Sequence, residues 1–306
     1  MKLLYRRGLC GLFAVLLAVL SSSAARADEI LVANQSGNTI GEYNTSGTTV
    51  NAALISGLNS PSFIAVSGSD LFVANLAAGT IGEYTTSGAT VNAALISGLN
   101  GPNGIAVSGS DLFVTNAGAG TVGEYTTSGA TVNASLISGL NGPQDIAVDG
   151  SDLFVTNLGG LHTPGHTIGE YTTSGATVNA SLISGLNSPL GIAVDGSDLF
   201  VTNLNAGTIG EYTTSGATVN AALISGLAGP VGIAIDGSDL FVTNGFGNTI
   251  GEYTTSGATV NASLISGLNA PTGIAIISTV PEPSSLTLLA LALAGIGFCG
   301  QRKRSS

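Results

Sequence analysis

The two histidines of this chain are the residues best suited to acid–base or metal chemistry. His162 and His166 lie four residues apart in the glycine-containing segment 158–166. Two histidines at this spacing face the same way on a helix, but a loop does not align their imidazoles. A catalytic zinc also normally requires three protein ligands, so the pair alone is weak evidence for a metal site. The segment is therefore either a small asymmetric site or a loop insertion that the fold tolerates, and we favour the insertion.

Asp145 is the acidic residue that we associate with this pair. It stands at a position where four of the five related segments have glycine and the remaining one has Phe63. We group Asp145 and Asn157 with His162 and His166 as candidate binding residues. No residue is predicted to be catalytic, and the identity of any metal stays open.

Carboxylates also recur with a fixed period. Pairs such as Asp149 and Asp152 flank Gly-Ser, although the first two equivalents have Ser67 or Ser108 in place of the leading aspartate. Aspartate and glycine favour turns, and Ca²⁺ needs several oxygen ligands at roughly 2.3–2.6 Å. We assign the aspartates to turns and the glutamates to a structural or solvating role, expect no cofactor, and keep Ca²⁺ as the alternative. The glutamates, each in Gly-Glu-Tyr, are Glu42, Glu83, Glu124, Glu170, Glu211 and Glu252.

Basic residues are confined to the two ends of the chain. Between Asp28 and Thr279 there is no lysine or arginine, so this part is strongly acidic. It cannot neutralise phosphates, which excludes nucleic acid as a partner, and anionic membrane surfaces are disfavoured for the same reason. Cations, neutral glycans and basic proteins stay compatible.

An internal repeat supplies the elements that position these residues. A unit of 41 residues recurs along the chain, and the fourth copy has 46 residues because of the extra residues around 159–166. A fixed period near 40 is typical of repeat architectures. The units begin at Ile30, Leu71, Leu112, Leu153, Leu199 and Leu240.

Each unit contains four short strand-like segments bounded by Gly, Asn, Ser and Pro. In the second unit they are 71–75, 80–84, 90–99 and 105–107. Short β-branched and aromatic runs between turn residues predict strands, and four strands per unit predict a propeller blade. A parallel β-helix is the alternative.

The stretch Pro189–Asn203, PLGIAVDGSDLFVTN, resembles the inner strand pair of NHL-repeat propellers, and this resemblance covers residues 30–277. The innermost I-A-V or I-A-I segment occurs six times, and so does the three-strand block that follows it. We therefore predict an all-β fold, a six-bladed β-propeller of four-stranded blades. The N-terminus gives three strands of one blade and the C-terminus the inner one, a three-plus-one closure that protects the edges.

In a propeller, the 158–166 loop and the segment that begins at Pro143 emerge on the same face, near the central channel. Asp145, His162 and His166 would approach one another there. Phe72, Tyr84 and their equivalents are expected to fill the space between blades.

Residues 1–27 have the pattern of a secretory signal peptide. Three basic residues precede the apolar run Leu9–Leu20, and Ala25-Arg26-Ala27 supplies a cleavage site. A retained anchor is the alternative, although the run is short for a membrane span. The two cysteines lie in the terminal apolar segments, so the middle of the chain has no thiol and no disulfide.

The last 27 residues resemble the PEP-CTERM sorting signal of Gram-negative bacteria. The motif Pro281-Glu282-Pro283, an apolar run and a basic tail follow one another in the required order. We predict that 280–306 is this signal, with a transmembrane helix at 285–300 and its tail in the cytoplasm. A plain C-terminal anchor is the alternative. The resemblance implies processing by an exosortase-type protease, commonly in bacteria that make exopolysaccharide.

The sequence thus predicts an exported protein with its propeller at residues 28–279. We expect it at the cell surface, in the extracellular matrix or anchored in the membrane. The leading hypothesis is a monomeric, non-catalytic binding or scaffold propeller whose partner is exopolysaccharide or a small ligand. One alternative is a metal-dependent lyase-like or hydrolase-like enzyme that uses the His162/His166 loop, because some similar propellers, the streptogramin lyases, use histidines. The other is a calcium-dependent adhesive surface protein.

Overall fold

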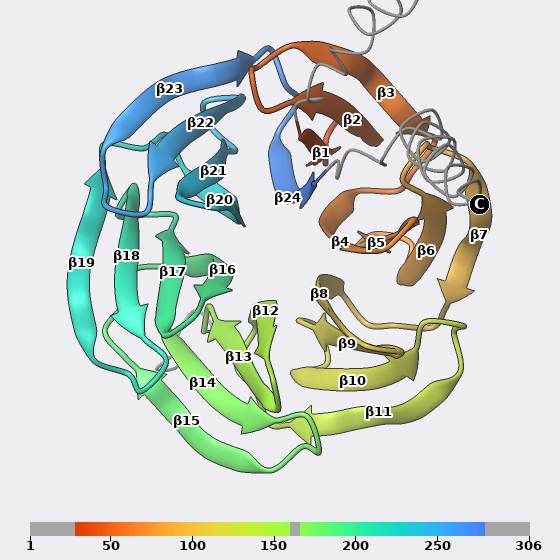
Figure 1. Ribbon diagram of the computed structural model, residues 1–306. Coiled ribbons are helices and arrows are strands. Elements are labelled where there is room, and N and C mark those ends of the chain that lie inside the picture. Colours follow the sequence, from red (N-terminus) through yellow and green to blue (C-terminus); the bar gives the residue numbers. More distant parts are fainter. Residues whose placement is uncertain (1–27, 160–165, 279–306) are drawn as a thin grey trace, which may run out of the picture. The chain divides into compact units, whose positions relative to one another are not determined.

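A computed structural model describes residues 28–159 and 166–278 of this chain. These residues form 24 strands in six four-stranded antiparallel sheets, which are arranged around a central axis (Figure 1). Within each sheet the strands run in order from the axis to the rim, so each sheet is one propeller blade. The all-β, six-bladed fold expected from the repeats is confirmed.

The blades repeat the same four strand positions. The innermost strands are β4 (Pro61–Ser67), β8 (Pro102–Ser108), β12 (Pro143–Asp149), β16 (Pro189–Asp195), β20 (Pro230–Asp236) and β24 (Pro271–Ile277). The second strands are β1 (Glu29–Asn34), β5 (Asp70–Asn75), β9 (Asp111–Asn116), β13 (Asp152–Asn157), β17 (Asp198–Asn203) and β21 (Asp239–Asn244). The third strands are β2 (Thr39–Asn44), β6 (Thr80–Thr85), β10 (Thr121–Thr126), β14 (Thr167–Thr172), β18 (Thr208–Thr213) and β22 (Thr249–Thr254). The outer strands are β3 (Thr49–Ser56), β7 (Thr90–Ile96), β11 (Thr131–Ser138), β15 (Thr177–Ile183), β19 (Thr218–Ser225) and β23 (Thr259–Ser266).

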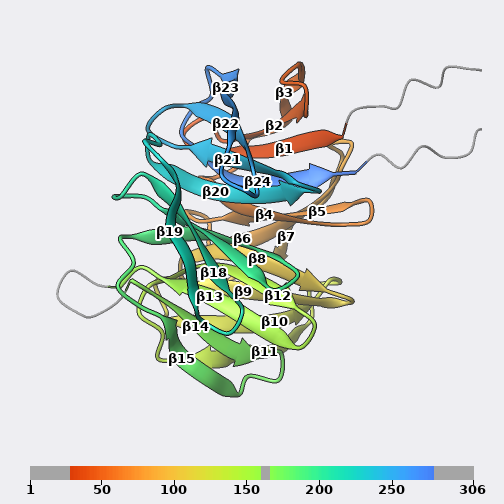
Figure 2. The same cartoon turned by 60° about the vertical axis from the view of Figure 1, so that its left-hand side comes forward.

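The ring closes by pairing its two ends. β24 is the innermost strand of the blade that β1, β2 and β3 complete, and Glu29 of β1 lies opposite Ile277 of β24. β24 also lies beside β20 and β4, the innermost strands of the two neighbouring blades (Figure 2). The three-plus-one closure is therefore confirmed, and the propeller completes its strand pairing with its own residues.

Two predicted segments lie outside the described residues: the signal peptide at 1–27 and the transmembrane helix at 285–300. In the part of the chain that the structure does describe, no helix is long and apolar enough to cross a membrane.

Apolar side chains fill the space between blades, as expected for the phenylalanine and tyrosine sets. Phe72 of β5, for example, packs with Leu112 and Tyr125 of the next blade. Such burial is the main favourable term in folding. Equally buried phenylalanines follow in other blades: Phe113, Phe154, Phe200 and Phe241.

The glycine of the Gly-Glu-Tyr motif makes room for the tyrosine two residues later. A Cβ atom on Gly210 would lie 2.6 Å from the hydroxyl of Tyr212, which is closer than real Cβ contacts come. The tyrosine ring therefore crosses the glycine, and its side chain hydrogen-bonds with Asn203 of the same blade. The motif is explained by packing and needs no ligand.

A β-bulge stands at the start of every innermost strand. In β12, Pro143 lies opposite Asn157 and Ile146 opposite Val155, so two residues of β12 face the single Thr156 of β13. A bulge leaves an extra backbone group unpaired and re-aims side chains. Here it frees the first residue after each proline for another role.

Buried threonines satisfy the freed backbone groups and connect the blades. Thr202 Oγ1 accepts a 2.7 Å hydrogen bond from the Gly191 amide and donates a 2.7 Å bond to the Val231 carbonyl of the next blade. Thr115, Thr156 and Thr243 bond in the same way to their own and the following blade. Where the two remaining blades have Ala33 and Ala74, hydroxyls at the bulge take part: Thr272 donates to the Ser62 carbonyl at 3.0 Å, and Ser62 donates to Asn103 Oδ1.

Candidate functional site

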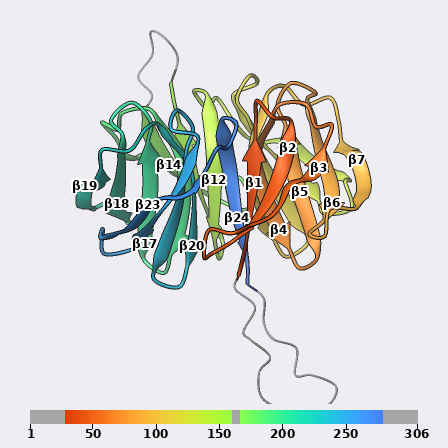
Figure 3. The ribbon, with the colours of Figure 1, turned by 90° about the horizontal axis from the view of Figure 1, so that it is seen from above.

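The propeller has two chemically different faces. One, which we call the mouth face, carries the prolines that start the innermost strands and the loops that join second to third strands. The opposite face carries the Gly-Ser hairpin turns and both ends of the ring, Glu29 and Ile277. In the edge-on view the start of β1 and the end of β24 lie together on one side of the ring (Figure 3).

A pocket of about 270 Å³ opens on the mouth face at the axis. Its central lining is the first residue after each innermost-strand proline, which we call the ring position. Loop residues Gln35, Leu76, Leu204, Gly245 and Phe246, together with Phe63, Ala270 and Pro271, complete the wall. The six ring-position residues are Thr272, Ser62, Asn103, Gln144, Leu190 and Val231, in order around the axis.

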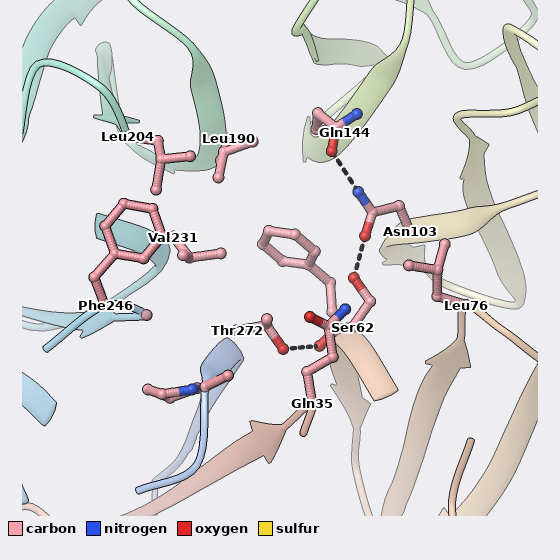
Figure 4. A pocket seen from close by; sticks show the side chains of 14 residues that line it. Gln35, Ser62, Leu76, Asn103, Gln144, Leu190, Leu204, Val231, Phe246 and Thr272 are labelled. Carbon is pink, nitrogen blue, oxygen red and sulfur yellow. Dashed lines mark hydrogen bonds between the residues drawn. The ribbon is translucent and has the colours of Figure 1, made fainter. Parts of the chain in front are cut away.

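One side of this pocket is polar. Thr272, Ser62, Asn103 and Gln144 occupy the ring position in four consecutive blades. Ser62 donates to Asn103 Oδ1, Asn103 Nδ2 donates to Gln144 Oε1 at 2.7 Å, and Gln144 Nε2 donates to the Gly142 carbonyl at 3.0 Å. Figure 4 shows the first two of these bonds as a continuous line along one edge of the pocket. Each amide NH₂ group has two donors and the network uses one, so donors stay available to a ligand.

The other side is apolar. Leu190 and Val231 fill the ring position of the next two blades, and loops of the same blades contribute Leu204 and Phe246. Figure 4 shows these four side chains together, facing the amide edge across the pocket. Phe246 is 74% exposed, more than any other large apolar side chain among the described residues.

Gly229 fixes the place of Phe246. A Cβ atom on Gly229 would lie 2.4 Å from the Phe246 ring, so the ring rests directly on the glycine backbone. The amide of Phe246 also donates to the Ala228 carbonyl at 3.2 Å. The exposed ring is thus held by the surrounding backbone at the edge of the pocket.

Differences between the blades concentrate on the mouth face. Toward the rim the copies hardly vary, and Thr80–Leu99 is identical to Thr208–Leu227. The ring position, in contrast, carries a different residue in each of the six blades. Aligning the repeats and reading the variable columns would have revealed this pocket, but our sequence reasoning used only the shared motifs and missed it.

Asp145, one of the predicted site residues, is buried between two blades. Its Oδ2 accepts a 3.1 Å hydrogen bond from the amide of Ile192 in β16. Burial raises the pKa of Asp145 to about 7, and backbone hydrogen bonds from Ile192 and Ile146 only partly oppose this rise. Its carboxyl group is therefore directed at the neighbouring blade.

His166 occupies a turn position. Its φ is 61°, and its Nδ1 accepts a 3.0 Å hydrogen bond from the amide of Ser188. The equivalent Asn38 and Asn248 have nearly the same φ, and their Oδ1 atoms accept from Ser60 and Ala270. The imidazole thus accepts the same turn hydrogen bond that the asparagine side chain accepts in two other blades.

The remaining predicted site residues have separate surroundings. Asn157 is buried at the end of β13, where its carbonyl accepts from the His166 amide at 2.8 Å. His162 lies outside the described residues. The structure therefore joins Asn157 to His166 through the backbone, whereas the hydrogen-bonded carboxyl oxygen of Asp145 faces β16.

The repeated carboxylates stand in pairs. Burial, followed by repulsion from Asp70, raises the pKa of Glu83, and the same pairing recurs in four further blades. Across residues 28–159 and 166–278, no three His, Cys, Asp or Glu side chains are grouped so that they could hold a metal ion.

Comparison with known proteins supports the two main sequence expectations. Residues 279–303 match the PEP-CTERM protein-sorting motif. No curated protein matches the chain. A propeller in a nidogen/laminin complex superposes with a TM-score of 0.71 at 18% identity, covering 83% of this chain and 100% of the other.

Two lyases are also similar in structure. A streptogramin B lyase has a TM-score of 0.61 at 21% identity over 83% of this chain and 84% of its own. A virginiamycin B lyase from Staphylococcus aureus has 0.58 at 21% identity over 84% and 94%. At these identities the likeness establishes the fold alone.

The chain is accordingly a six-bladed β-propeller with a PEP-CTERM sorting motif. That motif indicates a protein exported in a Gram-negative bacterium and is a recognition signal for exosortase processing.

Proposed function

We propose that this exported propeller is a non-catalytic binding protein of the cell surface or exopolysaccharide matrix, and that it binds through its mouth face. The observation that carries this proposal is the contrast between nearly identical rims and a ring position that differs in every blade. A purely structural ring has no need of six different residues around one pocket. Ligand pockets are concave, with a few placed polar groups on a largely apolar wall, and this pocket has that character.

The orientation of the ring suits this role. Ile277 lies on the face opposite the pocket, and the sorting motif begins at residue 279. The chain therefore leaves the propeller toward the motif at Ile277, away from the residues that line the pocket.

The enzyme alternative has less support. It relies on the histidine loop, yet His166 Nδ1 is already engaged with the Ser188 amide. The similar lyases are related by fold at about one-fifth identity, which transfers no activity.

The test is binding of the purified propeller, residues 28–278, to exopolysaccharide extracted from the producing bacterium, with calcium and with EDTA. Saturable binding in both conditions is the expected result. If the polymer is not retained in either condition, the matrix-binding role is wrong. Binding that requires calcium would instead support the adhesive alternative.

A further inference from the structure

The pocket contains no charged side chain among its lining residues. The nearest basic residues in the sequence lie outside 28–279, so an anionic ligand finds no counter-ion there. The carboxylates of the hairpin turns lie on the opposite face. The carboxyl group of Asp145, which follows Gln144 in the chain, is buried against the Ile192 amide and does not line the pocket, so a cation finds no partner there. Burying an unpaired charge is costly, and the pocket therefore selects an uncharged ligand.

The polar edge determines which uncharged ligand fits. Two side-chain amides and two hydroxyls form one continuous edge. Asn103 keeps one amide proton beyond its bond to Gln144, and Gln144 keeps one beyond its bond to the Gly142 carbonyl. Amides donate and accept at once, which matches hydroxyl groups, since these also donate and accept. A ligand with several hydroxyls along one edge is complementary to this side.

The apolar side requires a second feature of the same ligand. Leu190, Leu204 and Val231 form a wall that ends in the exposed ring of Phe246. An aromatic face held by backbone contacts binds a flat apolar surface at little entropic cost. A sugar ring combines both features, because its hydroxyls project at the edge and its C–H groups form an apolar face.

We propose that the pocket binds one unit of a neutral saccharide, with its hydroxyls on Asn103 and Gln144 and its C–H face on Phe246. This rests on the proposed binding function and specifies its ligand class. A volume of about 270 Å³ is just below the usual range of ligand pockets, which suits a single sugar unit or a chain end.

The experiment is saturation-transfer NMR on the propeller with the neutral methyl glycosides of glucose, galactose, mannose and N-acetylglucosamine. Methyl glucuronide and glucosamine serve as charged counterparts. At least one neutral glycoside should give a saturable signal, and the charged probes should give a weaker one. Phe246→Ala and Gln144→Ala should each weaken binding about tenfold or more, whereas Val132→Ala, at an exposed rim position, should not change it.

Further variants and a polymer assay keep the outcomes separate. If Gln144→Ala does not fold, Gln144→Leu introduces the residue that the next blade has at the ring position. Polymer binding without any glycoside signal, or glycoside binding that both pocket variants leave unchanged, overturns the saccharide pocket while the proposed function stands. Glycoside binding without polymer binding supports the pocket and overturns exopolysaccharide as the target.

Discussion

Asn103 Nδ2 donates a 2.7 Å hydrogen bond to Gln144 Oε1, which joins the ring positions of two adjacent blades. Thr272 and Ser62 occupy the ring position in the two blades before Asn103 and continue the polar edge. Leu190 and Val231 occupy it in the two blades after Gln144 and are apolar. Six nearly identical blades thereby enclose a pocket with one polar and one apolar side. The asymmetry comes from single substitutions at a bulge, where a side chain can change without disturbing the strand pairing.

Thr202→Val should destabilise the propeller because it removes both bonds of the interblade threonine. The Gly191 amide and the Val231 carbonyl would lose their partner, at a cost of about 2–6 kcal/mol for two unsatisfied groups. Urea unfolding measures the change in the free energy of unfolding. Thr218→Val, at an exposed position of β19, is the matched control and should have little effect. Equal effects of the two substitutions would contradict the interblade role.

Asp145→Asn should remove a pH dependence of stability. The pKa of Asp145 rises from 3.8 to about 7 on burial, so the folded state binds more protons than the unfolded state between these values. The wild type therefore loses stability as pH rises through this window, by up to about 4 kcal/mol. The variant retains an oxygen for the Ile192 amide and does not ionise.

Unfolding free energies at pH 4 and pH 8 test this. The free energy of unfolding of the variant should rise relative to that of the wild type as the pH increases. A constant difference between Asp145→Asn and the wild type at both pH values would show that the carboxyl does not titrate as described.

His166→Asn should leave stability nearly unchanged, because Asn38 and Asn248 already fill this turn position in other blades. His166→Ala should lose about 1–3 kcal/mol, since the Ser188 amide loses its acceptor and alanine is strained at a φ of 61°. Thermal unfolding followed by circular dichroism distinguishes the two variants. If asparagine proves as harmful as alanine, the imidazole has a role beyond this hydrogen bond.

Calcium should not affect the stability of the ring. The aspartates lie in hairpin turns, and the glutamates are paired with like charges rather than assembled into an oxygen cage. The midpoint of thermal unfolding should therefore be the same in excess calcium and in excess EDTA. An increase of several degrees in this midpoint with calcium would contradict the prediction and support a calcium-dependent adhesive protein.

Counting strands was sufficient for the fold. The repeat at Leu71, Leu112 and the other unit starts required four strands each, and the surplus inner segment at residues 274–276 required closure with the N-terminus. Both deductions depend on residues that all blades share. Residues that all blades share, such as Phe72 and Tyr84, indicate how the blades pack against one another.

The pocket could not be reached by the same route. Gln144 and Leu190 lie between a proline and the I-A-V segment, at a β-bulge that turns their side chains toward the axis. The sequence of a single repeat does not reveal this bulge. The histidines attracted attention because they are rare, yet His166 is a variant of an asparagine turn. A residue type that is rare in the whole chain and a position that varies between repeats are different signals. The variable position is the one that locates this pocket.

The most direct measurement is hydrogen–deuterium exchange of the propeller with and without the producing bacterium's exopolysaccharide. Slower exchange should be confined to the mouth face, at residues around Gln35, Asn103, Gln144, Leu204 and Phe246, with no change in the outer strands β3, β7, β11, β15, β19 and β23. Protection of the outer strands, or of the hairpin turns on the opposite face, would contradict the account.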